Sequence, residues 1–225
     1  PWGKPEATMG ETRAIMGRRR VPISSIVLVG GRSLRLGRDK AVEVLGGKSI
    51  IQRVLECLAP LSREILVVAA QDQPAPELGP VPGTRLLVDV LPGKGALGGL
   101  YTGLLAASSE HSLVVACDMP FLNRDLLKYM ISLCPGYDVV IPRVGGLVEP
   151  LHAIYSKHCL ASIEDLFRRN ERQIFQFYPQ VRTRHVEEEE LDRFDPGHLS
   201  FFNINTPADL ERARDLEGGS APAPA

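Results

Sequence analysis

Short apolar runs that alternate with helix-like segments are the feature that most constrains how this chain folds. Runs rich in β-branched residues at 25–29, 64–69, 85–88 and 112–117 have the length of buried strands. Apolar residues at helical spacing predict a helix over 49–58 with Ser49 as its cap, and a small-residue helix is predicted over 97–107. This alternation indicates βαβ units and therefore an α/β fold with a mostly parallel sheet.

The second half of the chain continues the alternation less regularly. Asn123 is the expected cap of a helix over 123–133, and Thr206-Pro207 is the expected start of a last helix. The remaining predicted elements are strands at 137–141 and 151–155, an edge strand at 182–186, a helix at 157–168, a solvated helix face at 187–190, and a Pro- and Gly-rich loop at 71–83.

No repeat or linker divides the chain, so we expect one domain over residues 23–216. Segment 1–22 has no apolar core of a signal peptide, and 217–225 is of low complexity, so both ends are expected to be disordered.

Composition excludes several classes of protein. The 26 Lys and Arg residues balance 27 Asp and Glu residues, which argues against a protein that coats nucleic acid. No apolar stretch approaches the roughly 20 residues of a membrane span. The 4 cysteines form no CxxC pair, which favours reduced thiols and a cytoplasmic location over a zinc module or disulfide scaffold.

Chemically notable residues follow three of the predicted strands. Val29 leads into Gly30-Gly31, Val88 into Asp89, and Cys117 into Asp118. Ligands of parallel α/β sheets bind at the carboxyl ends of the strands, and in such a sheet these three ends share one edge.

The segment GGRSLRLGRDK, residues 30–40, has the composition of a phosphate-binding loop. Glycines allow the backbone to approach a phosphate or a base, and Arg35 and Lys40 supply cations. The spacing fits neither a Walker A loop nor a G-x-G-x-x-G fingerprint. An ordinary turn with basic surface residues is the competing interpretation.

The same segment resembles the GGxSxRMGxDK signature of the molybdenum cofactor guanylyltransferases, a family of nucleotidyltransferases related to the enzymes that make sugar nucleotides. Three further stretches occur in that family's order: Asp89 before PGKGALGGL, then VVACDMPFL, then FFNINTPADL. Residues 149–151 also resemble the start of its [EQ]PLxAxY segment. The resemblance extends from residue 26 to residue 210, with departures at Val29, Leu36 and Gln71.

The resemblance implies a three-layer αβα, Rossmann-like nucleotidyltransferase fold. It also implies transfer of GMP from GTP to the terminal phosphate of molybdopterin or Mo-molybdopterin, with Mg²⁺ as cofactor and Asp118 as its ligand. Arg35, Lys40 and Asp118 are then the catalytic residues. The nucleotide would be bound by Leu28, Val29, Gly30, Gly31, Lys40, Gln71, Asp89 and Asp118, and the acceptor by Gly98, Gly99, Glu149, Asn203 and Asn205. Proteins that insert molybdenum and chaperones of the recipient oxidoreductases are the implied protein partners.

Several alternatives stay open at this point. Asp118 is also suited to a turn, Asp89 to capping its own loop, and Asn203 and Asn205 to capping the last helix. At the level of function, the alternatives are a related transferase that uses CTP or a sugar-phosphate acceptor, and a nucleotide-binding module without catalysis.

Overall fold

The computed structural model describes residues 21–30, 43–71 and 76–218. Its strands are β1 (Ile23–Val29), β2 (Val44–Leu45), β3 (Lys48–Ser49), β4 (Ile65–Ala69), β5 (Thr84–Val88), β6 (His111–Ala116), β7 (Val139–Val144), β8 (Leu147–Val148), β9 (His152–Ser156) and β10 (Thr183–Val186). Its α-helices are α2 (Ile50–Leu58), α3 (Gly95–Ala106), α4 (Arg124–Ser132), α5 (Cys159–Arg168), α6 (Glu188–Leu191) and α7 (Pro207–Glu217). Two 3-10 helices are η3 (Ile174–Gln180) and η4 (Leu199–Phe201).

Within the described residues, one 8-stranded sheet runs through the molecule in the order β10-β7-β9-β6-β1-β4-β5, with β8 paired to β7. Strands β6, β1, β4 and β5 pair in parallel, as do β7 and β10, whereas β9 pairs antiparallel with both of its neighbours. The prediction of a mostly parallel sheet, with 182–186 at its edge, is confirmed.

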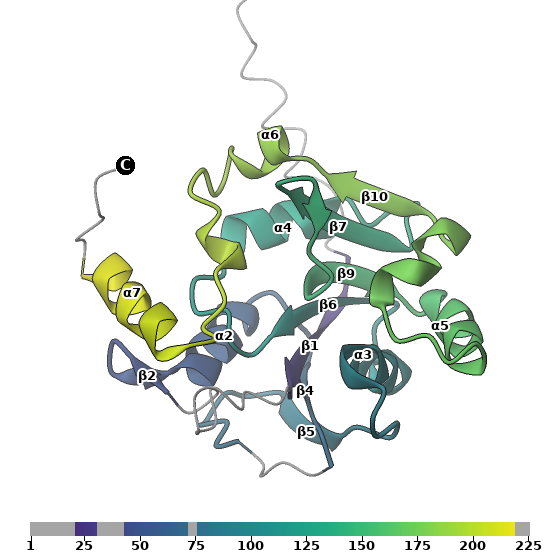
Figure 1. Ribbon diagram of the computed structural model, residues 1–225, viewed down its shortest axis with the longest axis horizontal. Helices are drawn as coiled ribbons and strands as arrows, with labels where there is room; N and C mark the ends of the chain where they lie inside the picture. The colour runs from purple at the N-terminus through teal and green to yellow at the C-terminus, as the bar shows by residue number, and fades with distance from the viewer. Residues whose placement is uncertain (1–20, 31–42, 72–75, 219–225) are drawn as a thin grey trace, which may run out of the picture.

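Helices cover both faces of this sheet (Figure 1). Helices α2 and α4 bury their apolar residues in one core, and α3, α5 and η3 bury theirs in a second core on the opposite face. Strand β1 is buried over its whole length, because β4 and β6 cover its edges and its side chains alternate between the two cores. The three-layer αβα architecture is therefore confirmed.

Local capping explains where three helices begin. Ser49 accepts a hydrogen bond from the backbone of Gln52 in a capping box, and Asn123 accepts from the first turn of α4. Thr206 makes the same box with Asp209 at the start of α7. The three predicted caps are confirmed, and most element boundaries shift by one or two residues.

Some elements were not predicted. They are the short hairpin β2–β3, the strand β8 and the two 3-10 helices. Helix α7 packs on the hairpin through a small third core, formed by Leu45, Ile50, Ile204, Leu210 and Ala213. No helix in the described part of the chain is long and apolar enough to cross a bilayer. The expected disorder of 1–22 and 217–225 falls almost wholly on segments outside the described residues, but α7 extends to Glu217, one residue into the second segment.

Candidate functional site

The register of the parallel strands gathers the predicted site residues at one edge of the sheet. Val29 lies opposite Ala69, Ala69 lies opposite Val88, and Leu28 lies opposite Ala116. The residues that follow these strands therefore leave the sheet side by side. The expectation that the three strand ends share one edge is confirmed; this edge comprises Gly30, Gln71, Asp89 and Asp118.

Asp89 is tied into its own loop. Its Oδ1 accepts hydrogen bonds from the Leu91 backbone N–H at 2.9 Å and from the Thr102 hydroxyl at 2.8 Å, and the side chain is largely buried. The Gln71 amide donates to the Asp89 carbonyl oxygen at 3.2 Å, so the structure brings these two predicted residues together. One carboxylate oxygen thus caps the loop. The other, Oδ2, makes no hydrogen bond to any residue that the structure describes.

Asp118 follows β6 and is half-buried. Its backbone carbonyl oxygen accepts a hydrogen bond from the Ile204 N–H at 3.0 Å. This bond places the segment that holds Asn203 and Asn205 against the end of β6, although it is more than eighty residues away in sequence.

The capping alternative for the two asparagines is wrong, because Thr206 and Asp209 cap α7 with their side chains. The Asn203 amide instead donates to the Phe201 carbonyl at 3.0 Å, and Asn205 is exposed.

Gly98 and Gly99 lie on α3 where it approaches the edge formed by these strand ends. A methyl group on Gly98 would come within 2.9 Å of Asp89 Oδ2, and one on Gly99 within 3.1 Å of the Leu28 side chain. These two glycines therefore allow α3 to pack closely against the strand ends of the protein itself. The Leu28 carbonyl also has a protein partner, the Cys117 N–H at 3.1 Å, whereas Gly30 lies exposed beyond the ladder.

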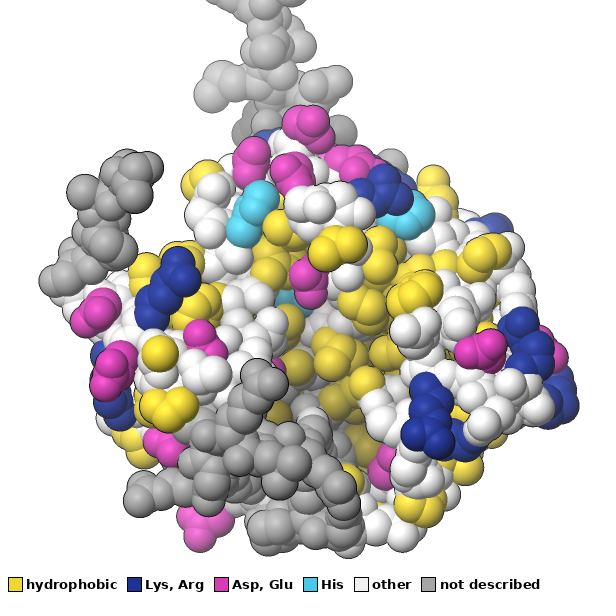
Figure 2. Space-filling view, in the orientation of Figure 1, with side chains coloured by type: hydrophobic (Ala, Val, Ile, Leu, Met, Phe, Trp, Pro, Cys, Tyr) yellow, Lys and Arg dark blue, Asp and Glu magenta, His cyan; other side chains and the backbone are white. Residues whose placement is uncertain are grey.

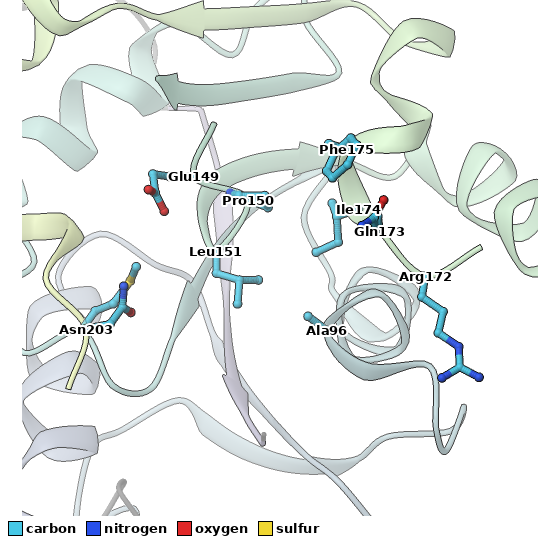
Figure 3. A pocket seen from close by; sticks show the side chains of 10 residues that line it. Ala96, Glu149, Pro150, Leu151, Arg172, Gln173, Ile174, Phe175 and Asn203 are labelled. Atoms are coloured by element: carbon cyan, nitrogen blue, oxygen red, sulfur yellow. The ribbon is translucent and has the colours of Figure 1, made fainter. Parts of the chain in front are cut away.

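A pocket of about 390 Å³ opens beside this edge. It is lined by Ala96, Met119, Glu149, Pro150, Leu151, Arg172, Gln173, Ile174, Phe175 and Asn203. Figure 2 shows apolar side chains gathered in a hollow in the middle of this face. In Figure 3, Glu149 and Asn203 lie on one side of the pocket, Phe175 and Arg172 lie on the other, and Leu151 lies between them.

The pocket combines an apolar surface with few polar groups. Burial raises the pKa of the Glu149 carboxyl, because the apolar surroundings disfavour its charged form. Phe175 is 47% exposed and lines the pocket, so this aromatic side chain is accessible to a ligand there. Concave apolar sites with a few placed polar groups are typical of small-molecule binding.

The second wall of the pocket was not predicted. Arg172 and Gln173 lie in the connection from α5 to η3, and Ile174 and Phe175 begin η3. These four residues face Glu149 and Leu151 only because of the tertiary fold. The one local signal is the run of apolar and aromatic residues in IFQFY directly after a charged stretch.

His152 is fully buried in β9 and packs on Phe201 with ring centroids 4.7 Å apart. His152 is therefore a packed residue of the core.

Arg35, Lys40 and Gly31 lie outside the described residues, and their predicted roles stay predictions. Among the described residues no group of three or more His, Cys, Asp or Glu side chains is placed to hold a metal ion. The single carboxylate of Asp118 fits Mg²⁺ where the phosphate oxygens of a ligand and water complete the coordination.

Comparisons with known proteins identify the relatives of this chain. A family model described as "MobA-like NTP transferase domain" matches residues 25–186. A probable molybdenum cofactor guanylyltransferase from Pelotomaculum thermopropionicum is 38% identical over 197 residues, which cover 88% of this chain and 94% of the relative. A molybdenum cofactor guanylyltransferase from Desulfosudis oleivorans is 35% identical over 193 residues, covering 85% of this chain and 94% of the relative.

A solved structure has the same architecture. The crystal structure of molybdopterin-guanine dinucleotide biosynthesis protein A from Archaeoglobus fulgidus superposes with a TM-score of 0.75 at 30% identity, covering 87% of this chain and 99% of that chain.

Proposed function

The chain belongs to the MobA-like NTP transferase family, and on that basis we propose that it transfers GMP from GTP to the terminal phosphate of molybdopterin or Mo-molybdopterin. The products are molybdopterin guanine dinucleotide and pyrophosphate. As part of this proposal, the reaction takes place in the cytoplasm, and proteins that insert molybdenum and chaperones of the recipient oxidoreductases are its protein partners.

The hydrogen bond between Ile204 and Asp118 is the observation that carries the proposal. It joins the edge of Gly30, Gln71, Asp89 and Asp118, which we call the nucleotide edge, to the pocket, because Asn203 lines the pocket and is the residue next to Ile204. A nucleotide at the strand ends and an acceptor in the pocket would therefore meet at Asp118. A transferase needs this arrangement of two substrates, whereas a simple nucleotide-binding module does not.

The proposed reaction needs no general base. The terminal phosphate of the acceptor is a monoester with a second pKa of about 6, so it is already ionised near neutral pH. One of its oxygens attacks the α-phosphorus of GTP, the bond between the α-phosphorus and the bridging oxygen breaks, and pyrophosphate leaves. Asp118 would hold Mg²⁺, which when bound offsets the repulsion between the two phosphates.

The remaining residues of the nucleotide side position GTP in this proposal. Arg35 and Lys40 neutralise the triphosphate and the leaving pyrophosphate. The backbone at Leu28, Val29, Gly30 and Gly31 lies along the base, near Gln71, and Asp89 Oδ2 accepts from the base or the ribose.

On the acceptor side, Glu149, Asn203 and Asn205 supply the polar contacts. Gly98 and Gly99 act indirectly, because they allow α3 to approach the strand ends.

The test is a turnover assay with purified protein, GTP, Mg²⁺ and molybdopterin, in which pyrophosphate and the dinucleotide are both measured. We expect Asp118→Asn to lower kcat by at least about a hundredfold, since it removes a charge that acts on the reacting phosphates. Asp125→Asn is the control: this exposed carboxylate on α4 pairs with Lys128 at 2.8 Å, away from the pocket lining.

Three results would contradict the proposal. Retained turnover in Asp118→Asn would mean that other residues hold the metal ion. A larger thermal stabilisation by CTP than by GTP would favour the cytidylyl alternative, and GTP binding without pyrophosphate release would favour a module without catalysis.

A further inference from the structure

The turn Glu149–Pro150–Leu151–His152 forms one wall of the pocket. Most of the backbone N–H and C=O groups of this turn have a hydrogen-bond partner within the protein. The His152 N–H donates to the Glu149 carbonyl at 3.1 Å and closes a β-turn. The Glu149 N–H donates to Pro142 at 3.1 Å, and the Leu151 carbonyl accepts from Ala116 at 3.2 Å. The carbonyl of Pro150, at the tip of the turn, has no backbone partner among the described residues.

A buried tyrosine supplies that partner. The Tyr155 hydroxyl donates to the Pro150 carbonyl at 2.8 Å, and it also lies 2.8 Å from the Tyr178 hydroxyl. Each hydroxyl carries one hydrogen. Since the Tyr155 hydrogen is directed to Pro150, Tyr178 must donate to Tyr155. The result is a chain of two hydrogen bonds that runs from Tyr178 through Tyr155 to the turn.

This chain connects the two walls of the pocket. Tyr178 belongs to η3, whose first residues, Ile174 and Phe175, line the side opposite the turn. The rings of Tyr155 and Tyr178 pack around Phe177 with centroids 6.1 and 5.1 Å from it, and all three side chains are buried. The hydroxyls thus join an aromatic cluster to a turn that carries ligand-facing groups.

The chain persists over the whole working pH range of an enzyme. Burial raises the pKa of both tyrosine hydroxyls far above neutrality, because the charged phenolate is disfavoured in an apolar core. Both groups therefore stay protonated and able to donate.

We propose that Tyr155 and Tyr178 are positioning residues that hold the turn 149–152 and η3 at a fixed separation, so that the acceptor pocket is formed before the acceptor binds. This inference rests on the proposed function, since it takes the pocket as the acceptor site. A preformed site binds its ligand without the cost of ordering the two walls. If the walls are released, only a fraction of the molecules is competent, and the apparent affinity falls by that fraction.

The experiment compares Tyr155→Phe and Tyr178→Phe with wild type in the GMP transfer assay. We expect the KM for molybdopterin to rise at least roughly threefold in Tyr155→Phe, because this variant loses both buried hydrogen bonds of the chain. Tyr178→Phe leaves the bond to Pro150 in place, so its effect is smaller. The KM for GTP and kcat stay unchanged in both, because the nucleotide edge is built by other strands. A loss of folded protein alone would instead lower the apparent kcat and leave the KM unchanged.

Tyr129→Phe is the matched control, since this tyrosine hydroxyl on α4 bonds Glu190 on the opposite face of the sheet. Hydrogen exchange of the free protein gives a second readout: amides of 149–152 and 172–177 exchange faster in Tyr155→Phe than in Tyr129→Phe.

An unchanged KM for molybdopterin, or an equal rise in the KM for GTP, would overturn the inference. Failure of wild type to transfer GMP would overturn the proposed function instead, so the two failures are distinguishable.

Discussion

Replacing Asp89 by alanine and by asparagine separates two roles that its carboxylate has in this structure. Oδ1 accepts from the Leu91 N–H and the Thr102 hydroxyl, and that hydroxyl in turn accepts from the Val90 N–H at 3.2 Å. Alanine removes the acceptor for two donors at once. Asp89 is only 8% exposed, so water replaces it poorly.

The expected loss of stability follows from these contacts. Each buried donor left without its acceptor costs about 1–3 kcal/mol, and Asp89→Ala leaves two such donors. The Thr102 hydroxyl can rotate toward another acceptor, which reduces its part of the cost. We therefore expect Asp89→Ala to lower the free energy of unfolding by about 2–4 kcal/mol. Asparagine keeps a carbonyl oxygen in the place of Oδ1, so Asp89→Asn is expected to cost less than about 1 kcal/mol.

Function gives the second readout. Oδ2 faces Gly98 and has no hydrogen bond within the described residues, so the proposed contact with GTP falls on this oxygen. A hydrogen bond to a charged group is worth about 1.5–3 kcal/mol, so Asp89→Asn is expected to raise the KM for GTP at least about tenfold in the pyrophosphate assay. Urea unfolding followed by far-ultraviolet circular dichroism measures the stability of both variants.

Two results would refute this reasoning. Asp89→Ala with wild-type stability would mean that the loop does not depend on Oδ1. Asp89→Asn with wild-type KM for GTP would leave Asp89 as a loop cap alone.

Two further predictions concern packing and pH. A methyl group on Gly103 would lie 2.6–2.9 Å from the buried Ile26 side chain, so we expect Gly103→Ala to lower stability by about 1–2 kcal/mol after its gain in helix propensity, measured by urea unfolding. In Gly99→Ala the new methyl group would lie 3.1 Å from the end of the flexible Leu28 side chain, so a smaller loss of stability than in Gly103→Ala is expected. An equal loss in the two variants would refute the packing argument. Burial lowers the pKa of His152 from 6.5 to about 4, against the opposing charge of Asp195. As pH falls, the unfolded chain therefore becomes protonated at His152 before the folded chain does. The free energy of unfolding is expected to fall by roughly 3 kcal/mol between pH 6.5 and pH 4. A His152→Leu variant should lack this part of the pH dependence.

Much of the fold could be predicted because its determinants are local. The alternation of β-branched runs with helical spacing identifies β1, β4, β5 and β6, and the caps Ser49 and Asn123 fix where α2 and α4 begin. Helix η3 has no such signal: it contains Pro179, and 3-10 geometry follows no 3.6-residue period. The hairpin β2–β3 has only two residues in each strand, too few for a periodic pattern to show.

The same distinction divides the candidate site. Gly30, Asp89 and Asp118 each follow a predictable strand, and a parallel register brings such strand ends together whatever the rest of the chain does. The pocket depends instead on contacts between distant segments, such as Tyr155 with Tyr178. A sequence can show that Tyr155 completes an [EQ]PLxAxY segment, but the partner of its hydroxyl is set by how η3 packs on β9.

This division has a consequence for how the two halves of the site respond to mutation. The strands that end at the nucleotide edge are held by the backbone ladder of a buried sheet, so a change that keeps the side-chain contacts of the loops, such as Asp89→Asn, is expected to alter only the chemistry of the changed group. The pocket walls are joined by side-chain hydroxyls and ring packing, so changes that touch no ligand can still alter acceptor affinity. Variants at the edge are therefore expected to change kcat or the KM for GTP, and variants in the Tyr155–Tyr178 chain the KM for the acceptor.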